Sequence, residues 1–189
     1  TSISQELARL MELQEMEMTQ IYYGALLHDL GKIGIPVEIL EYPGKLSPQA
    51  MKIMKTHVDI TEEIMNGEIE PVIANIALRH HEKLDGSGYP RGLGGEVLTP
   101  SERIVAIADI VSALNGRRSY KDAFGKEKIV GILTEMKEDG LLCEKTVDVM
   151  IRHFDEIMEN VRNTCEPVLN VYDHINIEFT ELCGVCEKI

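Results

Sequence analysis

Six histidine and aspartate side chains occur at positions where a soluble protein normally has apolar residues. They lie in apolar runs or on apolar helical stripes, and are His28, Asp29, His57, His80, His81 and Asp109. A lone inward-facing histidine is usually a satisfied core residue, and a lone buried aspartate usually pairs with Arg or Lys. Four of the six histidines of the chain at such positions, together with two aspartates, instead favour a metal site.

The adjacency of the ligands within two pairs indicates more than one ion. Successive residues of an α-helix point about 100° apart, because the helix has 3.6 residues per turn. We therefore expect His28 and Asp29 not to hold one ion from the same side, and likewise His80 and His81, whereas Asp29 can bridge two ions through its two oxygens. Mixed imidazole and carboxylate ligands fit iron, manganese or zinc better than calcium or magnesium. The residues alone predict at least two transition-metal ions.

The elements that must position these residues are helices. Apolar residues recur at spacings of three and four, which predicts helices over 3–18, 20–31, 47–67, 71–80, 103–115, 126–138 and 144–164. Two helix starts carry capping signals, namely Ser47 before Pro48 and a capping box from Thr99 to Glu102. Connections are expected over 31–47 and over the glycine-rich 82–98, and the sequence beyond Pro167 is weakly patterned. No alternating strand pattern of useful length occurs, so the predicted fold class is all-α.

Composition restricts the kinds of partner. The 189 residues suffice for one sizeable domain, and no apolar run approaches the roughly 20 residues that span a bilayer. The net charge of −13 repels phosphate polymers, so we expect no nucleic-acid polymer as a partner, although bound cations can still attract a small anion. The four cysteines are too unevenly placed for a disulfide framework, which favours a reducing cytoplasm. Because the chain opens on Thr1 rather than Met, we expect it to be part of something longer.

Two segments resemble signatures of a known family. LLHDLGKIGIP (26–36) resembles the His-Asp signature of the HD phosphohydrolase superfamily. RHHEKLDGSGYPRGL (79–93) is similar to the second signature of its HD-GYP branch, and His57, Asp109 and RRSYK (117–121) stand in the family's order. The resemblance covers about residues 5–165. It implies an all-α HD-domain helical bundle with additional C-terminal helices over residues 1–165, followed by a C-terminal tail (166–189) packed on the domain.

The resemblance also implies a bacterial, metal-dependent phosphodiesterase. Such enzymes hydrolyse a cyclic dinucleotide, chiefly cyclic di-GMP, with water activated by two or three divalent ions, most often iron or manganese. The six residues named above match the family's metal ligands. Asp29 and Lys32 match catalytic positions, with Lys32 contacting phosphate, and Arg118 and Lys121 match residues that bind the nucleotide. An upstream sensory or receiver domain is the usual regulatory partner.

One loop of the second signature is expected to shape the mouth of the site and to contact a partner protein. Its residues are Asp85, Gly86, Gly88, Tyr89 and Pro90.

The chain departs from the family pattern at three places. Family members usually supply a further His, sometimes with a Glu, from the helix before the HD signature, but residues 1–27 contain no histidine. By its usual spacing this ligand would fall just before Thr1. Ser112 stands where an aspartate is common, and Ser119 stands where the usual motif has proline. These departures keep two alternatives open: an HD phosphohydrolase acting on another nucleotide, and a degenerate module that binds ligand or partner without turnover.

Simpler interpretations also remain for individual residues. Lys32 could be only a cation at a helix C-terminus, Arg118 and Lys121 could be solvated charges, and the loop could be only a tight turn. The cysteines near the end of the chain could be inert or could form a small zinc site. The residues available for that zinc site are Cys165, His174, Cys183 and Cys186.

Overall fold

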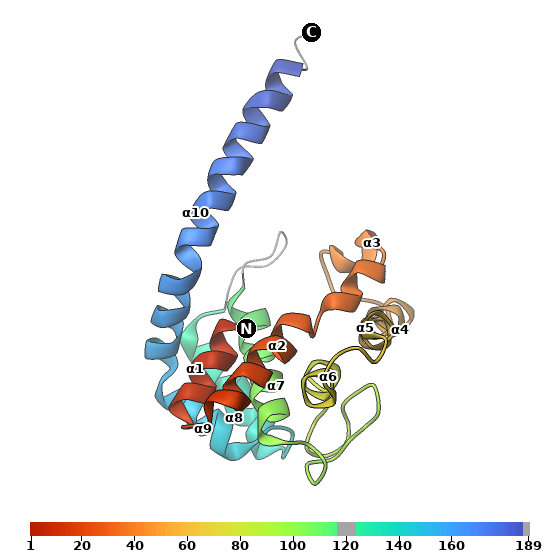
Figure 1. Ribbon diagram of the computed structural model, residues 1–189, viewed down its shortest axis with the longest axis vertical. Coiled ribbons are helices and arrows are strands. Elements are labelled where there is room, and N and C mark those ends of the chain that lie inside the picture. The colour runs from red at the N-terminus through yellow and green to blue at the C-terminus, as the bar shows by residue number, and fades with distance from the viewer. Residues whose placement is uncertain (117–123, 187–189) are drawn as a thin grey trace.

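The computed structural model describes residues 1–116 and 124–186, and within these ranges it is built from helices, with one isolated bridge between Asp85 and Gly94 (Figure 1). The prediction of an all-α fold is confirmed. The α-helices are α1 (Ser2–Leu10), α2 (Glu15–Leu27), α3 (Val37–Leu40), α4 (Pro48–Lys55), α5 (His57–Met65), α6 (Pro71–Leu78), α7 (Pro100–Asn115), α8 (Lys126–Glu138), α9 (Glu144–Arg152) and α10 (Phe154–Cys186), and a 3₁₀ helix η1 spans Leu30–Gly34. Each helix in the described part of the chain is too short or too polar to cross a membrane.

Helix α7 lies at the centre of the main core. Its residues Ile104, Ile107 and Val111 are fully buried and pack with apolar side chains of α1, α2, α8, α9 and the first turns of α10. Full burial of one such side chain contributes about 1.5–3 kcal/mol, so this cluster holds α7 in place. A second, smaller core joins α5 to α6 through Val58, Met65, Ala77 and Leu78.

The helix predicted over 3–18 is wrong, because the chain reverses between α1 and α2. Glu12 adopts a left-handed conformation with φ of 57°. Gln14 then caps α2 in a capping box with Glu17. Met11 and Leu13 pack against the same core as the two helices, which explains why the apolar spacing continues through the turn.

The single helix predicted from Ser47 to Gly67 consists of two helices. Ser47 is the N-cap, and its hydroxyl accepts the N–H of Ala50. At Thr56, however, the backbone N–H and the side-chain hydroxyl both donate to the carbonyl of Ile53. The break places His57 at the first position of α5 rather than inside a long helix.

The predictions for the last third of the described chain are partly wrong. Helix α8 matches the predicted range 126–138, but the helix predicted over 144–164 is interrupted at His153. Helix α10 then continues through Pro167 to Cys186, where a weakly patterned tail was expected. Its second half, drawn in dark blue in Figure 1, extends away from the body of the molecule. The domain boundary near residue 165 stays a prediction.

Candidate metal centre

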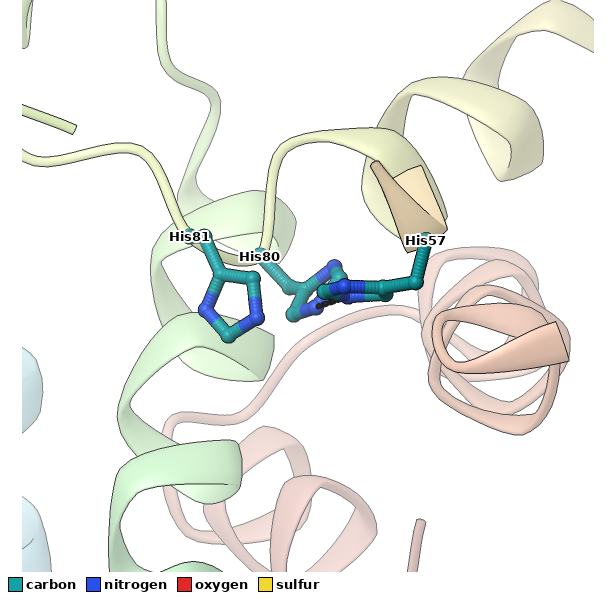
Figure 2. A group of neighbouring side chains, drawn as sticks. All are labelled: His57, His80 and His81. Atoms are coloured by element: carbon teal, nitrogen blue, oxygen red, sulfur yellow. Dashed lines mark hydrogen bonds between the residues drawn. The ribbon is translucent and has the colours of Figure 1, made fainter. Parts of the chain in front are cut away.

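The six predicted ligands come from four separate parts of the fold and meet at one place. His28 caps the end of α2 and Asp29 precedes η1, while His57 opens α5. His80 and His81 follow the end of α6, and Asp109 lies within α7. Figure 2 shows the side chains of His57, His80 and His81 pointing toward one another.

The carboxylate of Asp29 lies among three of the imidazoles. Its Oδ2 is 3.2 Å from Nε2 of His28, and its Oδ1 is 3.6 Å from Nε2 of His57 and 4.0 Å from Nε2 of His80. Oδ1 is buried and has no hydrogen-bond partner among the described residues. An anionic oxygen in this state requires a positive charge close by.

Asp109, on α7, lies between two of the imidazoles, those of His28 and His81. Its Oδ1 is 3.5 Å from Nε2 of His28, and its Oδ2 is 3.8 Å from Nδ1 of His81. Each carboxylate therefore turns its two oxygens toward different imidazoles. This is the arrangement that a bridging ligand requires.

Backbone hydrogen bonds orient three of the four imidazoles. The Nδ1 atoms of His28, His57 and His80 lie 2.8, 2.7 and 2.6 Å from the carbonyl oxygens of Ala25, Met54 and Ala77. A carbonyl only accepts, so each Nδ1 carries the proton, and in the neutral ring Nε2 keeps its lone pair free. Second partners of this kind are typical of metal-binding histidines. The Nε2 atoms of His57 and His80 are 3.5 Å apart, and when both rings are neutral both are acceptors, so neither can donate to the other and both lone pairs are available to a cation.

Two groups of potential ligands share His80. One contains His57, His80 and His81, and the other contains His28, Asp29 and His80, with the ligand atoms of each within 4.8 Å of one another. The expectation that adjacent residues cannot approach one ion is therefore wrong. The 100° separation applies within a helix, whereas both pairs lie where a helix ends and the backbone turns.

Burial and neighbouring charges shift the pKa values of the four histidines in different directions. Burial lowers the pKa of His57, and it lowers that of His80 to about 4 and that of His81 to about 2, so all three are neutral near pH 7. Burial also acts to lower the pKa of His28, but the carboxylates of Asp109 and Asp29 outweigh it and raise the pKa to about 9. Without metal, a proton on His28 thus offsets part of the carboxylate charge.

The carboxylates remain ionised down to low pH. Burial alone would raise the pKa of Asp29, but His28 and Lys32 hold it far below its ordinary value. The pKa of Asp109 is also lowered, because the neighbouring histidines outweigh its burial. Three neutral imidazoles, one exchangeable proton and two carboxylates fit divalent cations well.

Lys32 lies at the edge of this cluster, half-exposed in η1. Its Nζ is 2.5 Å from Oδ2 of Asp29. Two hollows meet here, one of about 310 Å³ and one of about 620 Å³, and Lys32 and Asp109 line both. The lysine therefore faces space where an anionic ligand could lie.

The loop of the second signature covers one side of the cluster. The ring of Tyr89 stacks on that of His81, with centroids 4.6 Å apart. Asp85 accepts hydrogen bonds from the backbone and hydroxyl of Ser87. A Cβ on Gly88 would lie 2.4 Å from Cα of Glu82, so glycine is required for this close approach.

Three residues that hold the backbone around the potential metal ligands in place were not identified from the sequence. Gly31 packs so closely on α5 that a Cβ would lie 1.9 Å from the carbonyl oxygen of His57, and its N–H donates to Oγ1 of Thr61. Glu82 is buried and accepts the backbone N–H groups of Arg91 and Leu93. Their signal was proximity to the signatures: Gly31 and Glu82 lie within the quoted segments, and Thr61 lies one turn after His57.

The remaining positions singled out in the sequence are either not described by the structure or lie beside the metal centre. Arg118, Lys121 and Ser119 lie outside the described residues. Ser112 is exposed and lines the 310 Å³ hollow beside His28 and Asp109, as does Thr1.

The zinc site proposed near the end of the chain is not formed within one chain. Cys165 and Cys183 belong to the same continuous helix α10. At 1.5 Å of rise per residue they lie about 27 Å apart along its axis, so they cannot share an ion.

Comparisons with known proteins agree with the two signatures. The family model described as "HD domain" matches residues 1–142. The 3'3'-cGAMP-specific phosphodiesterase 2 of Vibrio cholerae is 43% identical over 158 residues, which cover 82% of this chain and 30% of that protein. The cyclic di-GMP phosphodiesterase response regulator RpfG of Xanthomonas campestris is 42% identical, covering 77% of this chain and 39% of that protein. A cyclic di-GMP phosphodiesterase of Thermotoga maritima is also 42% identical, covering 82% and 45%.

A solved structure supports the fold. Bd1817, an HDG"Y"P protein from Bdellovibrio bacteriovorus, superposes with a TM-score of 0.64 at 18% identity, covering 82% of this chain and 51% of that chain. The chain thus spans less than half of the length of these curated relatives and about half of the structural neighbour. The helical fold and the six converging side chains are consistent with the family match over residues 1–142. The chain belongs to the HD domain family, with the HD-GYP signature at residues 79–93.

Proposed function

We propose that this chain is a metal-dependent phosphodiesterase that hydrolyses a cyclic dinucleotide, with cyclic di-GMP as the first candidate. The observation that carries the proposal is the pair of carboxylates, Asp29 and Asp109, spanning two groups of imidazoles that share His80. The names of the relatives, which are phosphodiesterases of cyclic di-GMP or 3'3'-cGAMP, support the substrate class.

We assign two divalent ions to this centre. His28 and Asp29 would hold one ion, and His57 and His81 would hold the other, with His80 and Asp109 near both groups. The mixture of imidazole and carboxylate ligands favours iron or manganese. When bound, such ions supply a water of lowered pKa and neutralise charge on a phosphate.

The protein's own groups then position the phosphodiester. Lys32 offsets charge on a non-bridging oxygen from the mouth of the two hollows, an electrostatic contribution that is usually large. The oxygen of a water forms a bond to phosphorus, the bond from phosphorus to the ribose oxygen breaks, and that oxygen takes up a proton. The product is the linear dinucleotide. Arg118 and Lys121 remain the predicted nucleotide-binding residues.

The two hollows suit a substrate with two nucleotide halves. They have volumes of about 310 and 620 Å³ and lie on either side of Lys32 and Asp109. A phosphate at the ligands would leave one half of the molecule for each hollow.

The test combines metal content with turnover. We expect protein prepared without oxygen and loaded with Fe²⁺ or Mn²⁺ to hold about two ions per chain and to linearise cyclic di-GMP. 3'3'-cGAMP, assayed in parallel, distinguishes the two named substrates. Lys32→Met should retain the metal but lose turnover by roughly 10²-fold or more, whereas Lys52→Met, an exposed lysine of α4, should retain both.

The degenerate-module alternative predicts a different result. Under this alternative the protein would bind the cyclic dinucleotide without hydrolysis, or would hold fewer than two ions. Either result would exclude the enzymatic proposal.

The setting of the domain is also a proposal. We propose a cytoplasmic location and a partner protein at the loop of Asp85 to Pro90, together with an upstream sensory or receiver domain. The last is consistent with the relatives being longer proteins.

A further inference from the structure

Helix α10 carries a heptad pattern along its whole length. Counting from Phe154, apolar residues recur at alternating spacings of four and three to the end of the chain. With positions a and d of the heptad assigned to this stripe, every one of them within α10 is apolar: Phe154, Met158, Val161, Cys165, Val168, Tyr172, Ile175, Phe179, Leu182 and Cys186. Hydrophobic residues make up only 44% of the chain, so this run is not a consequence of composition. An unbroken heptad repeat is typical of a coiled coil.

The body of the molecule covers only the first half of this stripe. Phe154 is buried in the main core, and Met158 and Val161 pack against it. Cys165 is half-buried beside the metal-centre hollow. Beyond this point α10 leaves the body (Figure 1).

In the second half the seam side chains that the structure describes are open to solvent. Tyr172, Ile175 and Phe179 are 61%, 56% and 64% exposed, and Val171 beside them is 60% exposed. Large apolar side chains that follow one another on one helix face usually mark an interface. A helix of about 20 residues without tertiary packing is also marginal in water, so this half requires a partner to be stable.

We propose that the second half of α10 forms a parallel, two-stranded coiled coil with a second copy of this chain. In parallel register the stripe of one helix faces the identical stripe of the other, which satisfies the self-complementarity of a two-fold dimer. The flanking e and g positions between 168 and 186 are Leu169, Val171, Asn176, Glu178, Cys183 and Val185. Glu178 is the one charge among them, and in parallel register position 178 would oppose position 183 of the other copy, a cysteine, so that the sequence opposes no like charges.

The exposed side chains on this face set the size of the contact. At their exposed fractions Val171, Tyr172, Ile175 and Phe179 each offer on the order of 100 Å² or less to a partner. Together they approach roughly 400 Å² per chain, or about 800 Å² for two chains, which is a small interface. The coiled coil would then join two HD domains into one dimer.

The mass of the full 189-residue chain in solution tests this proposal. We expect sedimentation equilibrium at micromolar concentration to give twice the mass of one chain. Phe179→Glu should give the mass of one chain while retaining metal binding, because the substitution lies far from the centre. The matched control is Asn163→Glu, at an exposed position outside the seam, which should leave the dimer intact.

Cross-linking tests the orientation. In protein with Cys165, Cys183 and Cys186 replaced by Ser, Tyr172→Cys should form a disulfide-linked dimer on mild oxidation, whereas Asn163→Cys should not. A parent chain of single mass, or Phe179→Glu with the mass of the parent, would overturn the coiled coil. A dimer in which Tyr172→Cys fails to cross-link would overturn the parallel register.

Discussion

At the scale of single residues, His80 is the residue that the two groups of potential metal ligands share. Its Nε2 lies 3.5 Å from Nε2 of His57 and 4.0 Å from Oδ1 of Asp29, and its ring is buried. We expect His80→Ala to reduce bound metal from about two ions per chain to less than one, with turnover falling by at least roughly 10²-fold, as measured by elemental analysis and nucleotide assay.

A histidine outside the centre provides the control for that substitution. His153 lies on the surface, where its Nδ1 is 2.9 Å from Glu156. His153→Ala should retain full metal content. Two ions per chain in His80→Ala would contradict the shared role.

The proton on His28 makes metal binding dependent on pH. Its pKa is raised from the ordinary 6.5 to about 9 in the metal-free protein, so below pH 9 an ion must displace a proton. Metal affinity should therefore rise with pH, by up to about tenfold per unit for this group, and level off above pH 9. Calorimetry at pH 7.5 in two buffers of different ionisation enthalpy should show release of about one proton, and His28→Gln should abolish that release.

At the scale of elements, Gly31 allows η1 to lie directly on α5. A Cβ there would meet the carbonyl oxygen of His57 at 1.9 Å, so Gly31→Ala must separate the elements that carry Asp29 and His57. We expect its free energy of unfolding to fall by about 1–3 kcal/mol and metal content to fall with it.

The same substitution in α8 should have the opposite effect. Nothing lies within 4 Å of a Cβ at Gly131, so Gly131→Ala should raise the free energy of unfolding by about 0.5–1 kcal/mol. Denaturant titration of both variants measures the contrast. Equal effects would exclude the close approach at Gly31.

Glu82 holds the loop of the second signature to α6. Its two oxygens accept the N–H groups of Arg91 and Leu93 at 2.8 and 2.9 Å. Glu82→Gln would oppose an amide NH₂ to one of these donors, which costs about 1–3 kcal/mol locally. Hydrogen exchange at residues 91–93 should be faster in this variant and unchanged in Glu96→Gln, an exposed residue of the same loop.

At the scale of the whole molecule, metal binding should stabilise the fold. The ligands come from α2, α5, α7 and the turn after α6, so an ion joins elements of both cores. At a hundredfold excess over its Kd an ion adds about 2.7 kcal/mol to the free energy of unfolding. For a chain of this size that corresponds to a Tm higher by roughly 5–10 °C.

Thermal denaturation with and without Mn²⁺ measures this effect. The His80→Ala variant should show little response to the ion. An unchanged Tm in the parent chain would mean that the ligands do not bind metal in the folded state.

The sequence by itself determined the helical class, the starts of α4 and α7, and the identity of the six residues that converge. Capping depends on a few neighbouring side chains, and buried polar residues in apolar runs are visible without a structure. The apolar spacing likewise predicted a helix near 126–138, which agrees with α8.

The tertiary structure decided where helices break and how the ligands are grouped. The reversal at Glu12 and the break at Thr56 are invisible to periodicity, because Met11, Leu13 and His57 face the same interior as the helices beside them. Only the ends of α2 and α6 bring the ligand atoms of His28 and Asp29, and those of His80 and His81, close enough to share one ion. The shared position of His80, the pKa of His28 and the exposed stripe of α10 all depend on which surfaces folding brings together and which it leaves open.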